Sequence, residues 1–306
     1  MPRAVRCAGV FFCLDPWDRS GNPAPIRTGA SALSPEFRNQ IVGLIRFSFV
    51  TTGDFYPGFD TVADMKAFLF DEARLERRFR LFEGICLPTL KAQTDPDFTC
   101  IFLLAQDFPK KWRKRLDKLL HGLPFVQIVE KPPMNHYQGI REAFAEVSSA
   151  GFTHRTSFRL DDDDAVNLNF IATLRALAAK VHTIPEKDEP IGISFNRGLY
   201  LTYSKQGTSY QRAVERTPLS IGTALLAPVS FAGNIYAYNH RALGQVHNTW
   251  MDQQDIVYLR TLHRDNKSNP HFSGSMEAVE PKRAAVLLRQ KFGFDFDTIE
   301  RLMAGT

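Results

Sequence analysis

The chain has 306 residues, of which 44% are hydrophobic and 23% are charged, and its formal net charge is +5 at pH 7. These values are typical of a globular protein with a substantial core, and they exclude a chain dominated by disorder. The modest positive charge suits an anionic partner, either a small phosphorylated ligand or an anionic membrane surface. We expect one α/β domain with appendages at its ends.

Residues 1–40 are rich in Pro, Gly, Ser and Arg and show no sustained period, which predicts a loosely held extension. The apolar patch at 8–14 is too short for a membrane span and poor for a signal peptide. The cysteines lack the spacing of a zinc site; they are Cys7, Cys13, Cys86 and Cys100. We therefore expect reduced, buried thiols and a cytoplasmic protein.

From residue 42 to residue 147 the sequence alternates between strand and helix patterns. Apolar, β-branched and aromatic runs predict buried strands at 42–52, 98–104 and 125–129. Helical spacing predicts helices at 71–90, 110–120 and 137–147. Pro88 is expected to kink or end the first of these helices. This alternation predicts a parallel sheet with right-handed crossovers.

A fourth strand at 154–160 precedes a helix at 167–181. Shorter strands are predicted at 191–195, 198–203 and 219–228, then a helix at 252–263 and a covering helix at 284–303, broken near Gly293. The predicted fold class is therefore α/β, Rossmann-like, with a mixed and mainly parallel sheet flanked by helices. We expect the domain to cover residues 41–280 and the covering helix to lie in 281–306.

Four consecutive aspartates, Asp161 to Asp164, follow the fourth strand without a spacer. Neighbouring carboxylates raise one another's pKa, and a divalent cation is one means of holding them together. An exposed, solvated acidic turn is the alternative. Position favours a ligand site, because ligands of open α/β sheets bind at the carboxyl ends of the strands. A cation held there beside the sheet would bind a nucleotide diphosphate and stabilise it as a leaving group.

Three segments of the sequence resemble a family of rhamnosyltransferases, which is similar to the nucleotide-sugar glycosyltransferases of the A-type fold. They are LERRFRLFEGICLPTLKAQTDPDF at 75–98, FRLDDDDA at 158–165 and YLRTLHRDNKSN at 258–269. The resemblance implies an enzyme that moves a sugar, rhamnose being one candidate, from a dTDP- or UDP-linked donor. The implied acceptor is a glycan or lipid-linked hydroxyl, in the synthesis of bacterial surface polysaccharide.

The resemblance implies Mn²⁺ or Mg²⁺ as the cofactor. It places the aspartate motif of the family on Asp161 and Asp163, and Asp164 is the neighbouring carboxylate. One carboxylate of such a motif reaches the ribose or a metal-bound water, and the next ligates the metal. Asp162 and Asp164 fit the spacing equally, because side chains two apart on an extended segment point the same way. His263 matches the late motif and would contact the metal or a phosphate; the alternative is a histidine that caps a helix end.

Four further residues are candidates for the site. Arg80, in the first matching segment, and Arg159, just before the aspartates, would approach the donor; the alternatives are a solvated side chain and an ion pair on the sheet face. Asp252 and Asp255 are candidates for the base of an inverting reaction. Their alternative role is at a helix N-terminus, where the macrodipole favours Asp.

Other function classes also place aspartates around a cation. A metal-dependent phosphohydrolase or nucleotidyltransferase is one alternative, and a Ca²⁺-stabilised glycan-binding module is another. Nucleic-acid binding is not expected, because basic residues are not interleaved with aromatics and no P-loop is present. The basic helix at 110–120 is either a solvated surface or a peripheral contact with the inner membrane.

Overall fold

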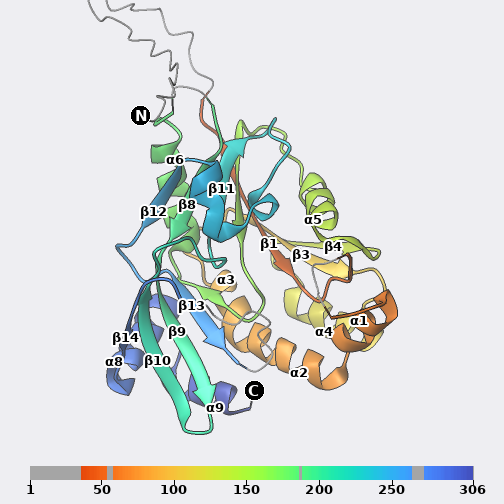
Figure 1. Cartoon of the computed structure of the whole chain (residues 1–306), viewed down its shortest axis with the longest axis vertical. Helices are drawn as coiled ribbons and strands as arrows, with labels where there is room; N and C mark the ends of the chain where they lie inside the picture. Colours follow the sequence, from red (N-terminus) through yellow and green to blue (C-terminus); the bar gives the residue numbers. More distant parts are fainter. Residues whose placement is uncertain (1–35, 54–57, 186–187, 264–271, 306) are drawn as a thin grey trace, which may run out of the picture. The chain divides into compact units, whose positions relative to one another are not determined.

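The computed structural model describes residues 36–53, 58–185, 188–263 and 272–305. Phe37–Thr306 forms one compact unit built around two sheets (Figure 1). The larger sheet has seven strands in the order β12-β8-β11-β6-β1-β3-β4. Their bounds are β1 (Asn39–Arg46), β3 (Thr99–Ala105), β4 (Val126–Lys131), β6 (His154–Arg159), β8 (Ile191–Phe195), β11 (Ala224–Pro228) and β12 (Thr249–Asp252).

Strand β1 is the point at which the order of the large sheet reverses. It pairs in parallel with β3 on one side and with β6 on the other, and β3 pairs in parallel with β4. Strand β11 is antiparallel to both β6 and β8. The predicted mixed, mainly parallel sheet is confirmed. Ligands of such sheets bind where the order reverses, here at the carboxyl ends of β1 and β6.

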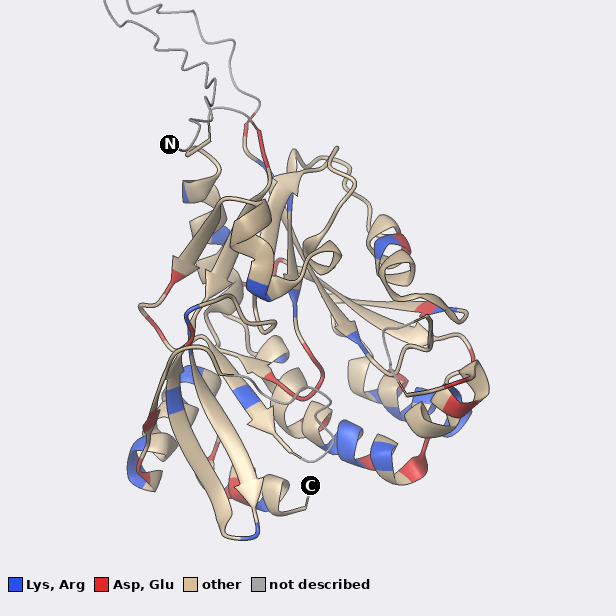
Figure 2. Ribbon diagram, viewed as in Figure 1, with Lys and Arg blue, Asp and Glu red and all other residues tan. Residues whose placement is uncertain are grey.

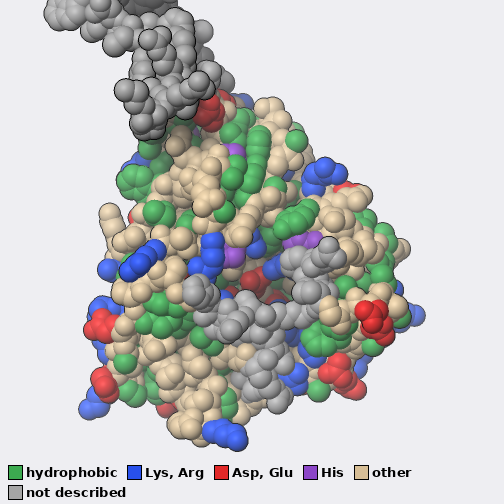
Figure 3. Space-filling view, in the orientation of Figure 1, with side chains coloured by type: hydrophobic (Ala, Val, Ile, Leu, Met, Phe, Trp, Pro, Cys, Tyr) green, Lys and Arg blue, Asp and Glu red, His purple; other side chains and the backbone are tan. Residues whose placement is uncertain are grey.

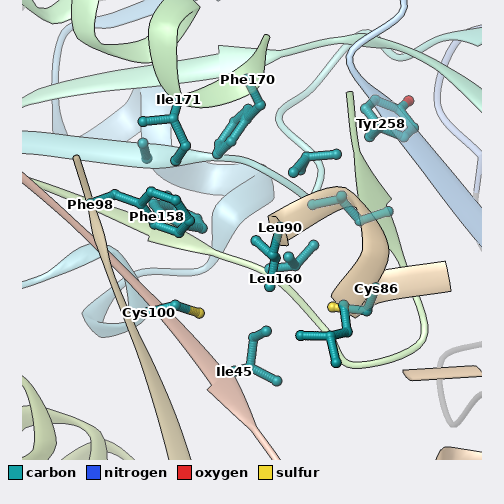
Figure 4. Close-up of a cluster of buried hydrophobic side chains, with 14 of the residues drawn as sticks. Ile45, Cys86, Leu90, Phe98, Cys100, Phe158, Leu160, Phe170, Ile171 and Tyr258 are labelled. Carbon is teal, nitrogen blue, oxygen red and sulfur yellow. The ribbon is translucent and has the colours of Figure 1, made fainter. Parts of the chain in front are cut away.

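Helices cover both faces of this sheet because residues alternate between its faces along each strand. Ile41 and Ile45 of β1 pack in one cluster with α2 (Glu72–Leu81), α4 (Lys110–Leu120) and α6 (Phe170–Val181). Figure 4 shows part of this core, where the Phe158 and Phe170 rings lie 5.2 Å apart. Val42 and Leu44 face the other side and pack with α5 (His136–Ala145) and the short helix η2 (Ile235–Ala237).

The predicted strand at 42–52 is interrupted. Ser48 adopts φ 58°, in the left-handed region that non-glycine residues rarely enter, so β1 ends at Arg46. The Arg74 guanidinium donates to Ser48 Oγ at 3.2 Å and supports this bend. Beyond it, β2 (Thr51–Thr52) pairs with β5 (Met134–Asn135) in a separate two-stranded sheet, which leads into α1 (Val62–Leu69) on one side and α5 on the other.

The helix that contains Pro88 does not end there. After α2 the chain forms a π-helical turn, η1 (Phe82–Cys86), and continues as α3 (Leu87–Lys91). The Leu87 N–H donates to the carbonyl of Phe82, five residues back. Proline has no N–H to offer, and the wider turn just before Pro88 accommodates this loss while helical backbone continues on both sides.

The smaller sheet has five strands in the order β14-β10-β9-β13-β7. Their bounds are β7 (Ala165–Val166), β9 (Arg197–Ser204), β10 (Gly207–Val214), β13 (Tyr258–Leu262) and β14 (Ser275–Ala278). A second apolar cluster joins this sheet to α8 (Pro281–Leu287), η4 (Leu288–Phe292) and α9 (Phe296–Ala304). The predicted covering helix is confirmed, and its break is at Gly293, which adopts φ 72°.

The predicted helix at 252–263 is wrong. Strand β12 ends at Asp252, and β13 pairs in parallel with β9 and antiparallel with β7. Tyr258 packs in the first core cluster and Leu259 in the second, so successive side chains point to opposite faces as in a strand. The apolar spacing was compatible with a helix, and only pairing with strands far away in the sequence selects the extended form.

None of the helices in the described part of the chain is long and apolar enough to cross a membrane. Many basic residues of α4 are neutralised by acidic neighbours. Arg115 pairs with Glu76 and Glu83, Arg113 with Asp117, and Lys111 with Glu72. These ion pairs favour a solvated helix surface over attachment to an anionic membrane.

Candidate functional site

The four aspartates form a turn, here called the acidic turn (Asp161 to Asp164), that links β6 of the large sheet to β7 of the small one (Figure 2). The Asp164 N–H donates to the Asp161 carbonyl at 3.3 Å. Asp162, Asp163 and Asp164 expose 1%, 5% and 5% of their surface, so the exposed acidic turn considered above is wrong. Because the segment turns, the side chains take different partners instead of pointing the same way in pairs.

Asp161 faces the end of β1. Its Oδ1 accepts from Arg46 Nη2 at 2.8 Å, and Arg46 is the last residue of β1. Arg46 Nη1 lies 3.1 Å from Nε2 of His136, the first residue of α5. Burial, with the charges of Arg46 and Arg159, lowers the pKa of His136 to about 3. The imidazole is therefore neutral, and its Nε2 accepts from the guanidinium.

Arg159 lies on the other side of the same region. Its guanidinium carbon is 4.6 Å from the centre of the Tyr236 ring, and Arg46 is 5.7 Å from that centre. Burial lowers the pKa of Arg159 and the charge of Asp161 opposes this effect. Since arginine keeps its proton in proteins, two positive charges stand at the carboxyl ends of β1 and β6, which is a suitable arrangement for an anionic ligand.

Asp162 and Asp163 face α2 through Arg78, a residue that the sequence did not single out. Arg78 Nε donates to Asp162 at 3.0 Å and Nη1 donates to Asp163 Oδ2 at 3.1 Å. Arg80 does not reach the acidic turn, and its guanidinium donates to the carbonyl of Gly305. Two residues along a helix are about 200° apart around its axis, so the two arginines point to opposite sides.

The other side of Asp163 is occupied by His263. Its Nε2 lies 3.0 Å from Asp163 Oδ2, and it follows directly on the end of β13. Burial alone would raise the pKa of Asp163, but Arg78 and His263 hold that pKa below its usual value. His263 does not cap a helix end, because the preceding element is a strand.

Strand β13 also holds Asp164. The Thr261 N–H donates to Asp164 Oδ1 at 2.9 Å, and the Thr261 hydroxyl donates to the Asp163 carbonyl at 2.7 Å. Burial raises the pKa of Asp164 well above its usual value, and the charges of Asp163 and Asp161 act in the same direction. A buried carboxyl in this state would be stabilised as a carboxylate by an added positive charge.

Asp163 Oδ2 and His263 Nε2 contact each other at 3.0 Å, and carboxylate oxygen and imidazole nitrogen are both ligand types of divalent cations. Two neighbouring ligands of an octahedral Mg²⁺ ion, with bonds of about 2.1 Å, lie about 3 Å apart. Within the described residues, no group of three or more His, Cys, Asp or Glu side chains is arranged to hold a metal ion. A cation bound by this pair would therefore keep several positions for water or ligand oxygens.

Asp252 and Asp255 lie apart from the acidic turn. Asp252 is at the carboxyl end of β12, which is parallel to β8, and β12 is three strands away from β6, or roughly 14 Å at the usual strand spacing. Asp255 forms an ion pair with Lys291 at 2.6 Å. Neither residue is at a helix N-terminus, because the next element of the described chain is strand β13.

A hollow is visible in the middle of the face shown in Figure 3, where acidic, basic and histidine side chains come together. Cys86 and Cys100 are buried free thiols, as predicted, and burial raises the pKa of Cys100. Cys7 and Cys13, the predicted extension up to residue 35, and residues 264–269 of the late motif lie outside the described residues.

Solved structures similar to this one include S. aureus TarS 1-349 in complex with UDP-GlcNAc, with 9% identity, a TM-score of 0.43 and coverage of 87% of this chain and 70% of that one. Another structure of S. aureus TarS is covered over 37% of its length. A putative nucleotide-diphospho-sugar transferase from Desulfovibrio desulfuricans G20 has 9% identity and a TM-score of 0.37, with 88% of this chain and 97% of that chain covered. No curated protein matches the chain.

The family model described as "Putative rhamnosyl transferase" matches residues 40–275. This match spans well over half of the chain and contains β1 from Gln40 onward, the acidic turn, β13 and His263. The α/β fold class implied by the resemblance of the three sequence segments is confirmed by the sheet itself. The chain belongs to this rhamnosyl transferase family, and the protein is a glycosyltransferase.

Proposed function

We propose that the protein transfers a sugar, with rhamnose as the first candidate, from a nucleotide diphosphate donor to a hydroxyl of a glycan or lipid-linked acceptor. The observation that carries this proposal is the acidic turn, buried beside Arg46 at the point where the strand order of the large sheet reverses. Carboxylate and guanidinium groups therefore lie together at the edge where open α/β sheets bind their ligands.

The donor diphosphate would lie against the arginines at the carboxyl ends of β1 and β6. Arg46 and Arg159 offer planar, bidentate donors to phosphate oxygens. The N-terminus of α5 is nearby, since its first residue His136 contacts Arg46. Asp161 is the most exposed carboxylate of the acidic turn, with a side-chain exposure of 33%, and would accept from a ribose hydroxyl in addition to Arg46.

Asp163 and His263 are the residues that would hold Mn²⁺ or Mg²⁺, with Asp164 buried beside them. When bound, the cation would neutralise charge that develops on the diphosphate as it leaves. Arg78 would keep Asp163 ionised and oriented, and the Thr261 N–H would orient Asp164. This division of roles is consistent with an aspartate motif on Asp161, Asp163 and Asp164.

Transfer exchanges one bond to the anomeric carbon for another. The acceptor hydroxyl oxygen forms a bond to that carbon, the bond between the carbon and the phosphate oxygen breaks, and the nucleotide diphosphate leaves with the electron pair. A base takes the hydroxyl proton in an inverting reaction. Asp252 remains our candidate, because it lies on the same edge of the sheet as Asp161, whereas Asp255 is held by Lys291.

Thermal unfolding with UDP or dTDP, with and without Mn²⁺, tests the donor and the cofactor. A ligand that binds only the folded state raises the melting temperature, and at 100 times its Kd the stabilisation is about 2.7 kcal/mol. We expect the nucleotide and Mn²⁺ together to raise it more than either alone. Asp163→Ala should abolish the increment due to Mn²⁺, whereas Asp107→Ala, at an exposed site, should keep it.

Product analysis separates the remaining classes. Incubation with dTDP-rhamnose or UDP-sugars and a glycan acceptor should yield a glycosylated product and free nucleotide diphosphate. Release of phosphate without sugar transfer would indicate a phosphohydrolase. Stabilisation by Ca²⁺ with no response to any nucleotide would instead indicate a glycan-binding module and refute the proposal.

A further inference from the structure

A cavity of about 530 Å³ opens between the start of α5 and the segment 231–238 that follows β11. Its size is within the range of small-molecule sites. None of the described residues that line it carries a carboxylate. The lining that matters here consists of Tyr137, Gln138, Arg141, Phe231, Tyr236 and Tyr238.

The lining combines aromatic faces with planar polar groups. Tyr137 is 55% exposed, and Phe231 is only partly buried. Gln138 and Arg141 add amide and guanidinium groups within the next turn of α5. A pyranose ring has the matching surface, because its C–H face packs on an aromatic ring while its hydroxyls exchange hydrogen bonds with amide and guanidinium groups.

Tyr236 connects this cavity to the charged site. It lines the cavity, and its ring lies 4.6 Å from the Arg159 guanidinium and 5.7 Å from that of Arg46. The Tyr236 hydroxyl donates to the Leu44 carbonyl at 2.6 Å, which fixes the ring against β1. A ligand in the cavity would therefore be separated by one side chain from Arg46 and its partner Asp161.

We propose that this cavity is the acceptor subsite and that it takes a sugar ring of a glycan acceptor, stacked on Tyr137 and Phe231. This inference rests on the proposed function, since it places the acceptor hydroxyl beside the donor's diphosphate. The lack of carboxylates and the presence of Arg141 suit a neutral sugar or one that carries an acidic substituent. Tyr236 lies at the boundary of the two sites, and the acceptor hydroxyl would reach the donor past the edge of its ring.

Saturation-transfer NMR tests the subsite without a known acceptor. The probes are methyl glycosides of L-rhamnose, D-mannose, D-galactose and N-acetyl-D-glucosamine, each added to the whole protein with saturating UDP or dTDP. We expect saturation of at least one glycoside by the wild type, and about tenfold weaker binding of it by Tyr137→Ala and by Phe231→Ala. Tyr137→Phe, which keeps the aromatic face, should bind nearly as the wild type does.

Phe68→Ala is the matched control, because Phe68 is an exposed aromatic residue of α1 that does not line the cavity. Nucleotide binding by every variant is measured in parallel by thermal shift. Saturation of no glycoside, or equal binding by Tyr137→Ala and the wild type, would overturn the subsite while a normal nucleotide response leaves the proposed function standing. A Tyr137→Ala variant that loses nucleotide affinity instead would identify the cavity as the nucleoside's and overturn it as well.

Discussion

At the acidic turn, a single arginine compensates the negative charge of buried carboxylates. Arg78 is 15% exposed and compensates two carboxylates, of which Asp162 is 1% exposed. Removing one member of a buried ion pair leaves the other charge without compensation, which costs about 3–5 kcal/mol. Arg78 thus determines whether the turn can remain buried and ionised when no other cation is bound.

Arg78→Ala is therefore expected to lower the free energy of unfolding by about 3 kcal/mol, measured by urea denaturation at neutral pH. Arg80→Ala, on the same helix, is the matched control and should cost under 1 kcal/mol, because Arg80 contacts only the Gly305 carbonyl among the hydrogen bonds described for it. Equal losses for the two variants would contradict the role assigned to Arg78.

Two histidines, the buried His136 and the partly buried His240, make stability depend on pH. Burial, together with nearby arginines, lowers the pKa of His136 and of His240 to about 3 in each case. The unfolded chain takes up these protons near pH 6.5 while the folded protein does not, so stability is lost as the pH falls below about 6.5. Each histidine contributes a loss of about 2 kcal/mol at pH 5.

His136→Gln should make the free energy of unfolding less dependent on pH between about pH 6.5 and 4, because the unfolded variant takes up roughly one proton fewer. The measurement is the urea midpoint of the wild type and the variant across that range. His121→Gln, at an exposed position after α4, serves as the control for loss of a histidine. A His136→Gln profile that parallels the wild type would show that His136 is protonated in the folded protein.

At the scale of elements, the close contact of β1 with β6 sets where the acidic turn begins. Gly43 of β1 lies opposite Phe158 in the parallel register, and a Cβ at Gly43 would come within 2.1 Å of the Phe158 ring. The ring fills the space that the missing side chain leaves, so glycine is required here by close approach. This contact fixes the register that brings Arg46 beside Asp161.

Gly43→Ala should cost about 2 kcal/mol or more in the free energy of unfolding, because the ring must leave its packed position. Gly244→Ala, where the nearest atom to the added Cβ is Thr249 Oγ1 at 4.0 Å, should change the free energy of unfolding by less than about 1 kcal/mol. Circular dichroism in urea measures both. Two variants of equal stability would mean that the sheet relaxes around the added methyl group.

For the whole molecule, the acidic turn depends on both sheets at once. β6 leads into the turn from the large sheet. β13 of the small sheet supplies Thr261, and His263 follows its end. Thr261 and Asp163 are 98 residues apart in the sequence. Residues 37–306 form one compact unit, so we expect the two sheets to unfold together.

Ile299→Ala tests this coupling. Ile299 is 1% exposed in the cluster that joins α9 to the small sheet, and its truncation should cost about 2–4 kcal/mol. In a background where Trp112 of α4 is the only tryptophan, its fluorescence reports on the large sheet. The fluorescence and circular dichroism midpoints should fall together. A fluorescence midpoint that stays in place while the other falls would indicate two independent units.

The sequence alone determined the strand and helix alternation around the acidic turn, the helix break at Gly293 and the placement of the aspartates at the end of a strand, because each depends on local spacing and turn chemistry. The sequence also identified His263, but only because the segment that contains it resembles the late motif of the family. It misassigned β13 as a helix and did not find Arg78. Both depend on contacts between distant segments. For β13, apolar spacing over a short run is compatible with a helix and with a strand. Arg78 differs from the other arginines of α2 only in lying on the side of the helix that faces the acidic turn.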